Sequence, residues 1–181
     1  MDTNSFWTLV ADTRGLAVAA RPESVVEEHV RTVTAALEGL SDDDVRGFLR
    51  ELRAARARAN RWDLWAAAHL ALGGASDDSF LDFRNWLISH GQETYERVLS
   101  DPDSLADLTW DEDENDFGAA EEWSYAPIEV LEQRGLDEDD VDEDDDLDDQ
   151  FGEPSGEPFP ENDDDWFAAR LPRLWAKHRV A

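Results

Sequence analysis

The side chains best suited to bind a ligand lie in one stretch, residues 60–91, around the turn Gly-Gly-Ala-Ser-Asp-Asp at 73–78. Arginines and aspartates are interspersed there with tryptophans. Charged groups beside aromatic walls are typical of hollows that bind small polar molecules. We therefore expect a ligand-binding pocket where one helix ends and the next begins. Its candidate residues are Arg61, Trp62, Asp63, Trp65, Asp77, Asp78 and Arg84.

The same stretch also fits a purely structural role. Ser76 or Asp77 can cap the following helix, an interaction worth about 1 kcal/mol. Arg61 or Arg84 can form a structural ion pair with an aspartate, and the tryptophans can fill a core. We expect the stretch to build mainly the core and to leave one candidate pocket at the glycine turn.

No pattern elsewhere in the chain predicts catalysis. There is no cysteine, which excludes a thiol nucleophile, a disulfide bond and a thiolate metal site. The serines lack a nucleophile elbow, and no glycine-rich phosphate loop is present. We predict no catalytic residue, no metal ion and no cofactor, and a non-enzymatic role is favoured. The histidines, which lack metal-binding spacing, are His29, His69, His90 and His178.

Residues 111–122 partly resemble a calcium-binding loop. Acidic or amide side chains fall at its first, third and fifth positions, and Glu122 falls at the twelfth. The sixth position requires glycine for a sharp turn, but this chain has Asp116 there. We therefore expect diffuse cation binding by carboxylates rather than a specific calcium site.

The net charge of -29 is distributed very unevenly. Residues 101–165 contain 29 acidic side chains and one basic side chain, Arg134, whereas residues 166–181 contain four basic side chains and no acidic one. Nucleic acid and anionic membranes are expected to be repelled by such a chain. A basic protein is the better partner, and the oligomeric state stays open.

Length and composition favour one soluble domain. The 181 residues are enough for a real core, and 41% of them are hydrophobic. We expect neither a signal peptide at the start nor a membrane-spanning segment. The lack of cysteine fits a reducing compartment, so we expect a cytoplasmic protein.

Apolar residues recur at spacings of three and four through most of the chain, which predicts helices. We expect them over 4–15, 22–39, 42–72 with a break near Asn60, 77–90, 92–101 and 124–135. Sustained alternation of apolar and polar residues, the strand pattern, is missing. The predicted fold is an all-α single helical domain of about six helices around an aromatic-rich core.

Composition divides the chain into three parts. We expect a helical core domain over 1–135, an acidic disordered linker over 136–164, and a C-terminal element over 165–181 that docks on the core. The linker cannot bury enough apolar surface to order itself. Three roles stay open for it: a repulsive spacer, a segment that folds back on arginines of this chain, or a segment that captures a basic partner. The arginines in question are Arg46, Arg50, Arg53 and Arg56.

The central stretch resembles a bacterial family known as domain of unknown function (DUF) 4240. The matching residues are Arg61-Trp62-Asp63-Leu64-Trp65, Gly73-Gly74, Ser76-Asp77-Asp78, Phe80, Phe83-Arg84 and Trp86-Leu87-Ile88. Phe6-Trp7, Tyr125 to Gly135 and Leu171 to Lys177 are similar to further elements of that family. The resemblance implies a mostly helical, soluble bacterial domain, and it implies no reaction.

Two hypotheses about function follow. The first is a non-enzymatic, acidic protein-interaction module that binds a basic partner. The alternative is a small-molecule-binding or enzymatic helical domain, with its pocket at the Gly-Gly-Ala-Ser-Asp-Asp turn. The two hypotheses differ in whether the acidic segment or the pocket residues are needed for binding.

Overall fold

The computed structural model of the protein describes residues 1–109, 116–136 and 152–179. Within these ranges the chain is helical and contains no strand, so the predicted all-α class is confirmed. The elements are α1 (Thr3–Ala20), α2 (Val25–Glu38), α3 (Asp42–Arg58), α4 (Trp62–Leu72), α5 (Asp77–Ser89), α6 (Gln92–Ser100), the 3-10 helix η1 (Pro102–Asp107), α7 (Asp116–Gln133), α8 (Asp164–Arg170) and α9 (Pro172–Arg179).

The predicted number of about six helices is too low. Helix α3 ends at Arg58 and α4 begins at Trp62, so the break predicted near Asn60 is confirmed and the stretch 42–72 forms two helices. The C-terminal element also contains two, because Pro172 follows the end of α8 and a proline ring clashes with the preceding helical turn.

Local capping signals set the ends of the central helices. At the start of α3, the Ser41 hydroxyl accepts a hydrogen bond from the Asp44 amide. Ser76 caps α5 in the same way, and Ser79 completes a reciprocal capping box. Gly73 ends α4 with a φ of 68°, a left-handed conformation that glycine adopts without strain. These ends lie where the sequence predicted them.

Helix α1 is longer than the predicted helix over 4–15. Asp2 caps it, and the helix continues through Gly15 to Ala20. A glycine inside a helix costs about 1 kcal/mol relative to alanine. Ala17, beyond the glycine, is fully buried, so packing outweighs this local preference.

Helix α7 begins at Asp116, earlier than the predicted range 124–135, and contains Pro127 within it. Proline removes one backbone hydrogen bond, but Trp123 and Val130 on either side of it are buried in the core and hold the helix together. Positions six to twelve of the predicted calcium-like loop, residues 116–122, are therefore helical. Residues 111–115 of that predicted loop lie outside the described residues.

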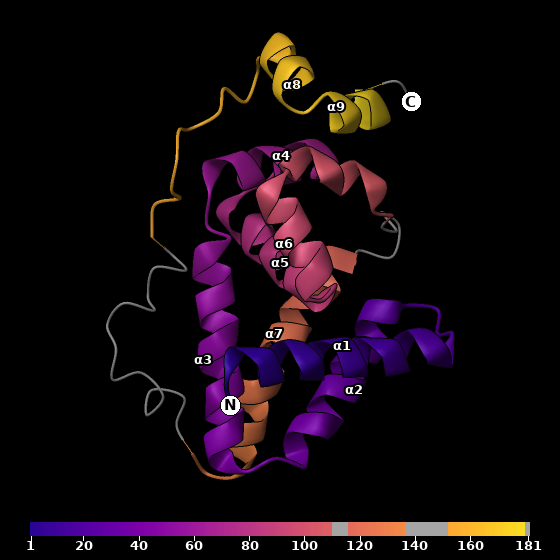
Figure 1. Ribbon diagram of the computed structural model, residues 1–181, viewed down its shortest axis with the longest axis vertical. Helices are drawn as coiled ribbons and strands as arrows, with labels where there is room; N and C mark the ends of the chain where they lie inside the picture. Colours follow the sequence, from indigo (N-terminus) through magenta and orange to yellow (C-terminus); the bar gives the residue numbers. More distant parts are fainter. Residues whose placement is uncertain (110–115, 137–151, 180–181) are drawn as a thin grey trace.

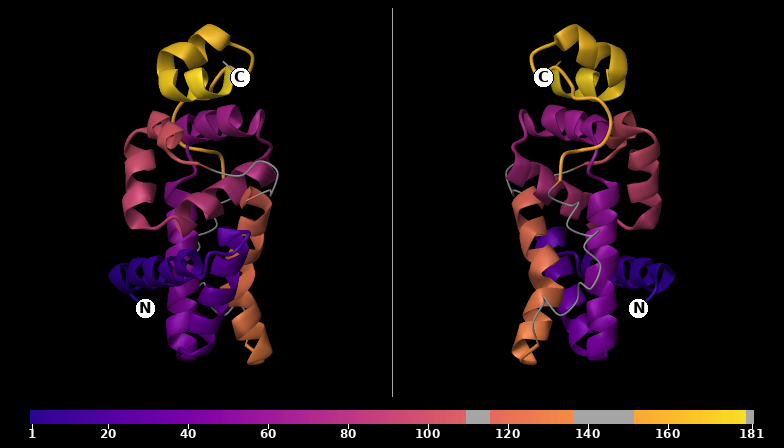
Figure 2. Two further views of the ribbon diagram at one scale, coloured as in Figure 1. Left: turned by 90° about the vertical axis from the view of Figure 1, so that its right-hand side faces the viewer. Right: turned by 90° about the vertical axis from the view of Figure 1, so that its left-hand side faces the viewer.

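Helix α7 is the central element of the fold, since it packs against α2, α3 and α5. Helix α1 packs across α2 (Figure 1). Helices α8 and α9 cover the end of the molecule formed by α4 and η1 (Figure 2), and α9 contacts both of these elements. The arrangement places the start of α4 next to the C-terminal part of the chain.

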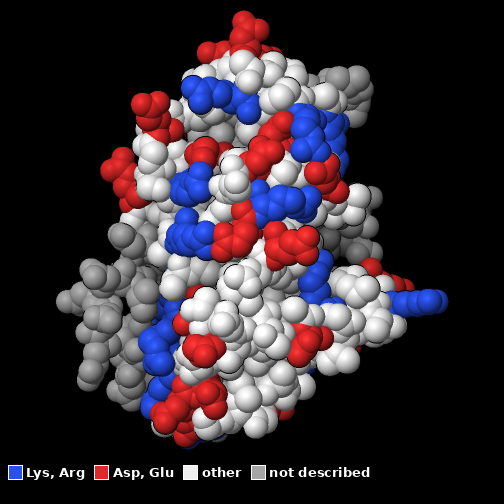
Figure 3. All heavy atoms as spheres, in the orientation of Figure 1, with Lys and Arg blue, Asp and Glu red and all other residues white. Residues whose placement is uncertain are grey.

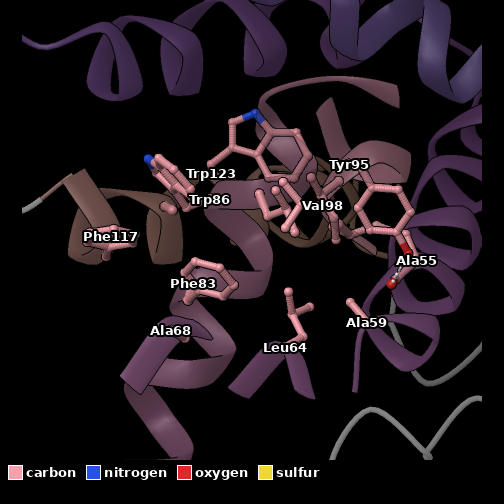
Figure 4. Close-up of a cluster of buried hydrophobic side chains, with 14 of the residues drawn as sticks. Ala55, Ala59, Leu64, Ala68, Phe83, Trp86, Tyr95, Val98, Phe117 and Trp123 are labelled. Carbon is pink, nitrogen blue, oxygen red and sulfur yellow. Dashed lines mark hydrogen bonds between the residues drawn. The ribbon is translucent and has the colours of Figure 1, made fainter. Parts of the chain in front are cut away.

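The core is rich in aromatic side chains, as the composition predicted. Trp86 of α5 and Trp123 of α7 are fully buried, and Phe117 packs 4.8 Å from the Trp86 ring (Figure 4). Tyr95 of α6 is also buried, and its hydroxyl donates a 2.8 Å hydrogen bond to the Ala55 carbonyl of α3. The hydroxyl is therefore satisfied inside the core, and α6 is tied to α3.

Part of the predicted linker has a defined course. Ser155 forms a parallel bridge to the start of α4: its carbonyl accepts from the Trp62 amide, and its amide donates to the Asn60 carbonyl, both at 2.9 Å. The Asn60 side chain also donates to the Gly152 carbonyl at 2.8 Å. Phe159 is buried. Residues 152–159 therefore lie against the α3–α4 junction, whereas residues 137–151 of the linker lie outside the described residues.

A search of the described residues for a helix both long enough and apolar enough to cross a membrane found none.

Candidate functional site

Most of the predicted pocket residues line a hollow of about 420 Å³ between the start of α4, the start of α5 and the segment Gly152–Pro154. We call it the tryptophan hollow. Five of the seven predicted residues line it: Trp62, Trp65, Asp77, Asp78 and Arg84. Gly152–Pro154, which belongs to the predicted linker, also lines it.

The other two predicted residues, Arg61 and Asp63, line a second hollow of about 450 Å³ beside α8. We call it the C-terminal hollow, and Glu157, Trp166 and Arg170 also border it. Ser155, which is bridged to the start of α4, belongs to the chain segment that borders both hollows. The seven predicted residues therefore do not converge on one site.

The wall of the tryptophan hollow is a stack of parallel groups. The Trp62 and Trp65 rings lie 5.1 Å apart and 10° from parallel, and the Trp65 and Phe80 rings lie 4.7 Å apart at 14°. The Arg84 guanidinium lies 4.9 Å from the centre of the Phe80 ring. Residues three or four apart share one helix face, so α4 and α5 each supply two members. Trp65 is also fixed by a 3.1 Å hydrogen bond from Nε1 to the Ala75 carbonyl.

The rim of the tryptophan hollow is acidic. Asp77, Asp78 and Glu153 are exposed and line it. None of them forms an ion pair with a residue in the described part of the chain. Ser76 supplies the cap of α5, so Asp77 and Asp78 are not needed for capping, although both lie near the positive end of the helix.

Two arginines are buried beneath this rim. Arg84 Nη1 donates to the Arg56 carbonyl at 3.2 Å, and Arg56 Nε donates to Asn85 Oδ1 at 2.7 Å. Burial lowers the pKa of Arg84 to about 10. Burial, with repulsion from Arg84, lowers the pKa of Arg56 to about 10 as well. Both guanidinium groups therefore remain charged at neutral pH.

Asp82 shows the effect of the acidic surroundings. Partial burial, together with the nearby carboxylates of Glu121 and Asp78, raises the pKa of Asp82 to about 6. Asp82, Asn85 and Arg56 are not among the residues that the sequence predicted for the site. Arg56 lies on α3 and the other two lie on α5, so these residues come together only when the two helices pack against each other.

Arg61 and Asp63 behave as the structural alternative predicted. Arg61 forms an ion pair with Asp63, with Nε 3.0 Å from Oδ1. Arg61 Nη1 also donates to the Leu99 carbonyl at 2.9 Å, which ties the start of α4 to α6. Asp63 in turn accepts from the Leu64 amide. These contacts fix the α4 terminus and leave both residues at the edge of the C-terminal hollow.

Neither hollow is lined by a histidine. His29 is fully buried, and its Nε2 lies 2.9 Å from the Thr13 hydroxyl. His69 packs against the rings of Phe159 and Phe167. Among the described residues, no group of three or more histidine and acidic side chains could hold a metal ion. The described part of each hollow thus offers a binding surface of aromatic, arginine and carboxylate side chains.

Comparison with known protein families identifies a match. The family described as "Protein of unknown function (DUF4240)" matches residues 1–133. No curated protein and no solved structure matches the chain significantly. The family match ends with α7, so the segment 152–159 and helices α8 and α9 lie beyond it, including Leu171 to Lys177, which the sequence analysis had included in the resemblance.

Proposed function

Because the chain belongs to the DUF4240 family of proteins of unknown function, we propose a function from its own surface: a non-enzymatic interaction module that binds a basic segment of a partner protein at the tryptophan hollow. The observation that carries this proposal is the exposed acidic rim, Asp77, Asp78 and Glu153, above a wall of stacked rings. The rim carboxylates have no cationic partner in the described part of the chain.

A lysine or arginine side chain of the partner suits this arrangement. Its alkyl stem can lie against apolar ring surface while its charged end stays in water. The three rim carboxylates attract that charged end. The cation stays at the rim and does not enter the hollow more deeply, because the buried Arg84 beneath the rim carries the same charge.

The charge of the whole chain supports a basic partner. A net charge of -29 attracts a basic protein over long range and speeds the encounter, and this steering weakens as salt rises. The affinity therefore has two parts, a diffuse attraction to the entire chain and a local contribution from the rim.

A charge-matched comparison separates these two parts. We expect the triple variant Asp77→Asn, Asp78→Asn and Glu153→Gln to bind Lys/Arg-rich probe peptides about tenfold more weakly, or about 1.4 kcal/mol. The control replaces three exposed carboxylates elsewhere, Glu23→Gln, Glu93→Gln and Glu161→Gln, and changes the net charge equally. Titration calorimetry at fixed salt gives both affinities. Equal loss in the two variants would reject the rim as the binding site.

The volume of the tryptophan hollow favours a second candidate, a small-molecule-binding domain. About 420 Å³ falls within the range of roughly 300–1,000 Å³ found for ligand pockets. A panel of small molecules, tested by thermal melting with the full chain, would raise the melting temperature in a saturable way. Loss of that rise in Asp78→Ala, with stability retained, would favour this candidate over the interaction module.

A further inference from the structure

One face of α3 carries a row of arginines. Arg46, Arg50 and Arg53 follow one another at spacings of four and three, which places them on the same side of the helix. We call this row the arginine face. Basic side chains gather along the edge of the molecule over α3 (Figure 3). Arg50 is exposed and the other two are half-buried. The face therefore presents several positive charges within a short length.

Two of these arginines have no counter-charge among the described residues. Neither Arg46 nor Arg50 forms an ion pair there, and the buried Nε of Arg46 has no hydrogen-bond partner. Each long side chain could bend toward solvent, so exposure alone does not identify a partner. The positions of residues 136 and 152, next to the two ends of α3, do identify one.

The described chain stops at one end of α3 and resumes at the other. Close to Leu136, Arg134 donates to the Leu40 carbonyl and pairs with Asp42, at the N-terminal end of α3. The chain resumes at Gly152, whose carbonyl accepts from the Asn60 side chain, just beyond the C-terminal end of α3. Figure 1 shows these two points at opposite ends of the helix. The intervening residues, 137–151, connect them.

The length and composition of residues 137–151 suit the face between these points. Helix α3 has 17 residues, so it is about 25 Å long at 1.5 Å per residue. Fifteen residues of extended chain span up to about 50 Å, which is enough to follow the helix around its side chains. Eleven of these fifteen residues are acidic and none is basic. The charge is complementary to that of the arginine face.

We propose that the arginine face of α3 is a docking surface for residues 137–151 of the same chain. Attachment at both ends gives the segment a high effective concentration at the face, so weak ion pairs are enough to hold it. Contact begins about one turn into the helix, at Arg46, because Asp42, Asp43 and Asp44 occupy the first turn and repel carboxylates. The proposal does not depend on the binding of any partner at the tryptophan hollow.

Docking on this face also leaves acidic groups for other contacts. Eleven carboxylates face three arginines, so most of the segment's charge stays directed toward solvent. Since residue 152 borders the tryptophan hollow, the docked segment would extend the acidic surface away from the rim. A competing occupant of the arginine face would be an anionic segment of another protein, which lacks the advantage of the two attachments.

The absence of cysteine makes a direct distance measurement simple. The full chain with Ala54→Cys on the exposed side of α3 and Leu147→Cys in the segment is spin-labelled at both sites. Pulsed electron resonance then gives the distribution of distances between labels. At about 0.1 M salt we expect one dominant distance, and at about 1 M salt a distribution about twofold wider, because the ion pairs are screened.

The arginine variants decide between docking and chance proximity. Arg46→Gln, Arg50→Gln and Arg53→Gln together should broaden the distribution at low salt as much as high salt does. A matched control removes the same charge elsewhere, with Arg21→Gln, Arg31→Gln and Arg170→Gln. It should leave the distance distribution narrow. A distribution already broad at low salt, or one that neither the α3 variant nor salt changes, would overturn the proposal. Circular dichroism verifies folding, and the salt titration needs no α3 substitution.

Discussion

His29 is completely buried between α1, α2 and α7, with its ring 5.5 Å from that of Trp123. A charged imidazolium would lose its hydration at this position, so burial lowers the pKa of His29 to about 3, helped by repulsion from Arg14. The side chain is neutral near pH 7 and serves packing rather than proton transfer. For His29, burial decides the protonation state and the role of the side chain more than its chemical type does.

The lowered pKa of His29 predicts how stability depends on pH. The unfolded chain binds a proton near pH 6.5 and the folded chain only near pH 3, so this contribution to stability is lost as pH falls through that window. From pH 6.5 to about pH 5 the loss is about 2 kcal/mol. Urea unfolding of the wild type and of His29→Gln measures it: the difference between their free energies should shrink at acid pH. A constant difference would contradict the prediction.

A second prediction at this scale concerns the start of α5. Ser76 makes the capping hydrogen bonds and Asp77 does not, so Ser76→Ala should lower the free energy of unfolding by about 1 kcal/mol. Asp77→Asn should lower it by about 0.3 kcal/mol, since only the interaction with the helix end is weakened. Urea unfolding at pH 7 compares them. A larger loss of stability in Asp77→Asn than in Ser76→Ala would show that Ser76 is not the residue that caps α5.

At the scale of elements, the junction of α3 and α4 organises the surface. The helix break at Ala59–Arg61 exposes backbone groups, and Ser155 satisfies two of them. The bridge places residues 152–158 between the tryptophan hollow and the C-terminal hollow. A break between two helices thus becomes the place where a distant segment attaches.

Phe159 should hold this segment in place. Its ring packs 5.3 Å from His69 and 5.8 Å from Phe167. We expect Phe159→Ala to cost about 3 kcal/mol in the local stability of residues 152–160, because a buried aromatic ring is removed. Hydrogen exchange at the Ser155 and Trp62 amides should accelerate.

The control for that prediction is Tyr125→Ala, which removes an exposed aromatic ring, 47% accessible, from α7. It should leave exchange at both amides unchanged. Slow exchange in Phe159→Ala would mean that the backbone bridge alone fixes the segment.

At the scale of the whole molecule, the net charge of -29 works against the compact state, since like charges approach one another on folding. Most ion pairs of the described residues lie at the surface, for example Arg58 with Glu96 and Arg173 with Asp107. Such exposed pairs contribute little individually. The aromatic core must therefore supply most of the stability against this repulsion.

This balance predicts that salt stabilises the fold. Screening at about 0.5 M salt should relieve repulsion and raise the melting temperature relative to about 0.01 M salt. Each kcal/mol gained corresponds to about 2–4 °C for a chain of this size. Thermal melts of the full chain at several salt concentrations test this. A fall in melting temperature would show that attractive ion pairs outweigh the repulsion.

The sequence alone determined the features that depend on neighbouring residues. Spacings of three and four predicted helices, and Ser41, Ser76 and Gly73 predicted where helices begin and end, because caps act within one turn. The family was also recognisable from the local motif around Trp62. Where local preference and packing disagreed, as at Gly15 and Pro127, packing prevailed.

The composition of the candidate site was decided only by the tertiary structure. Arg61 and Trp62 are adjacent in sequence but line different hollows, because residues 152–158, about ninety positions later, border both of them. The burial of Arg56 beside Arg84 likewise requires α3 and α5 to pack together. Periodicity and capping report interactions within a few residues, whereas a hollow is enclosed by segments that meet only when the chain is folded.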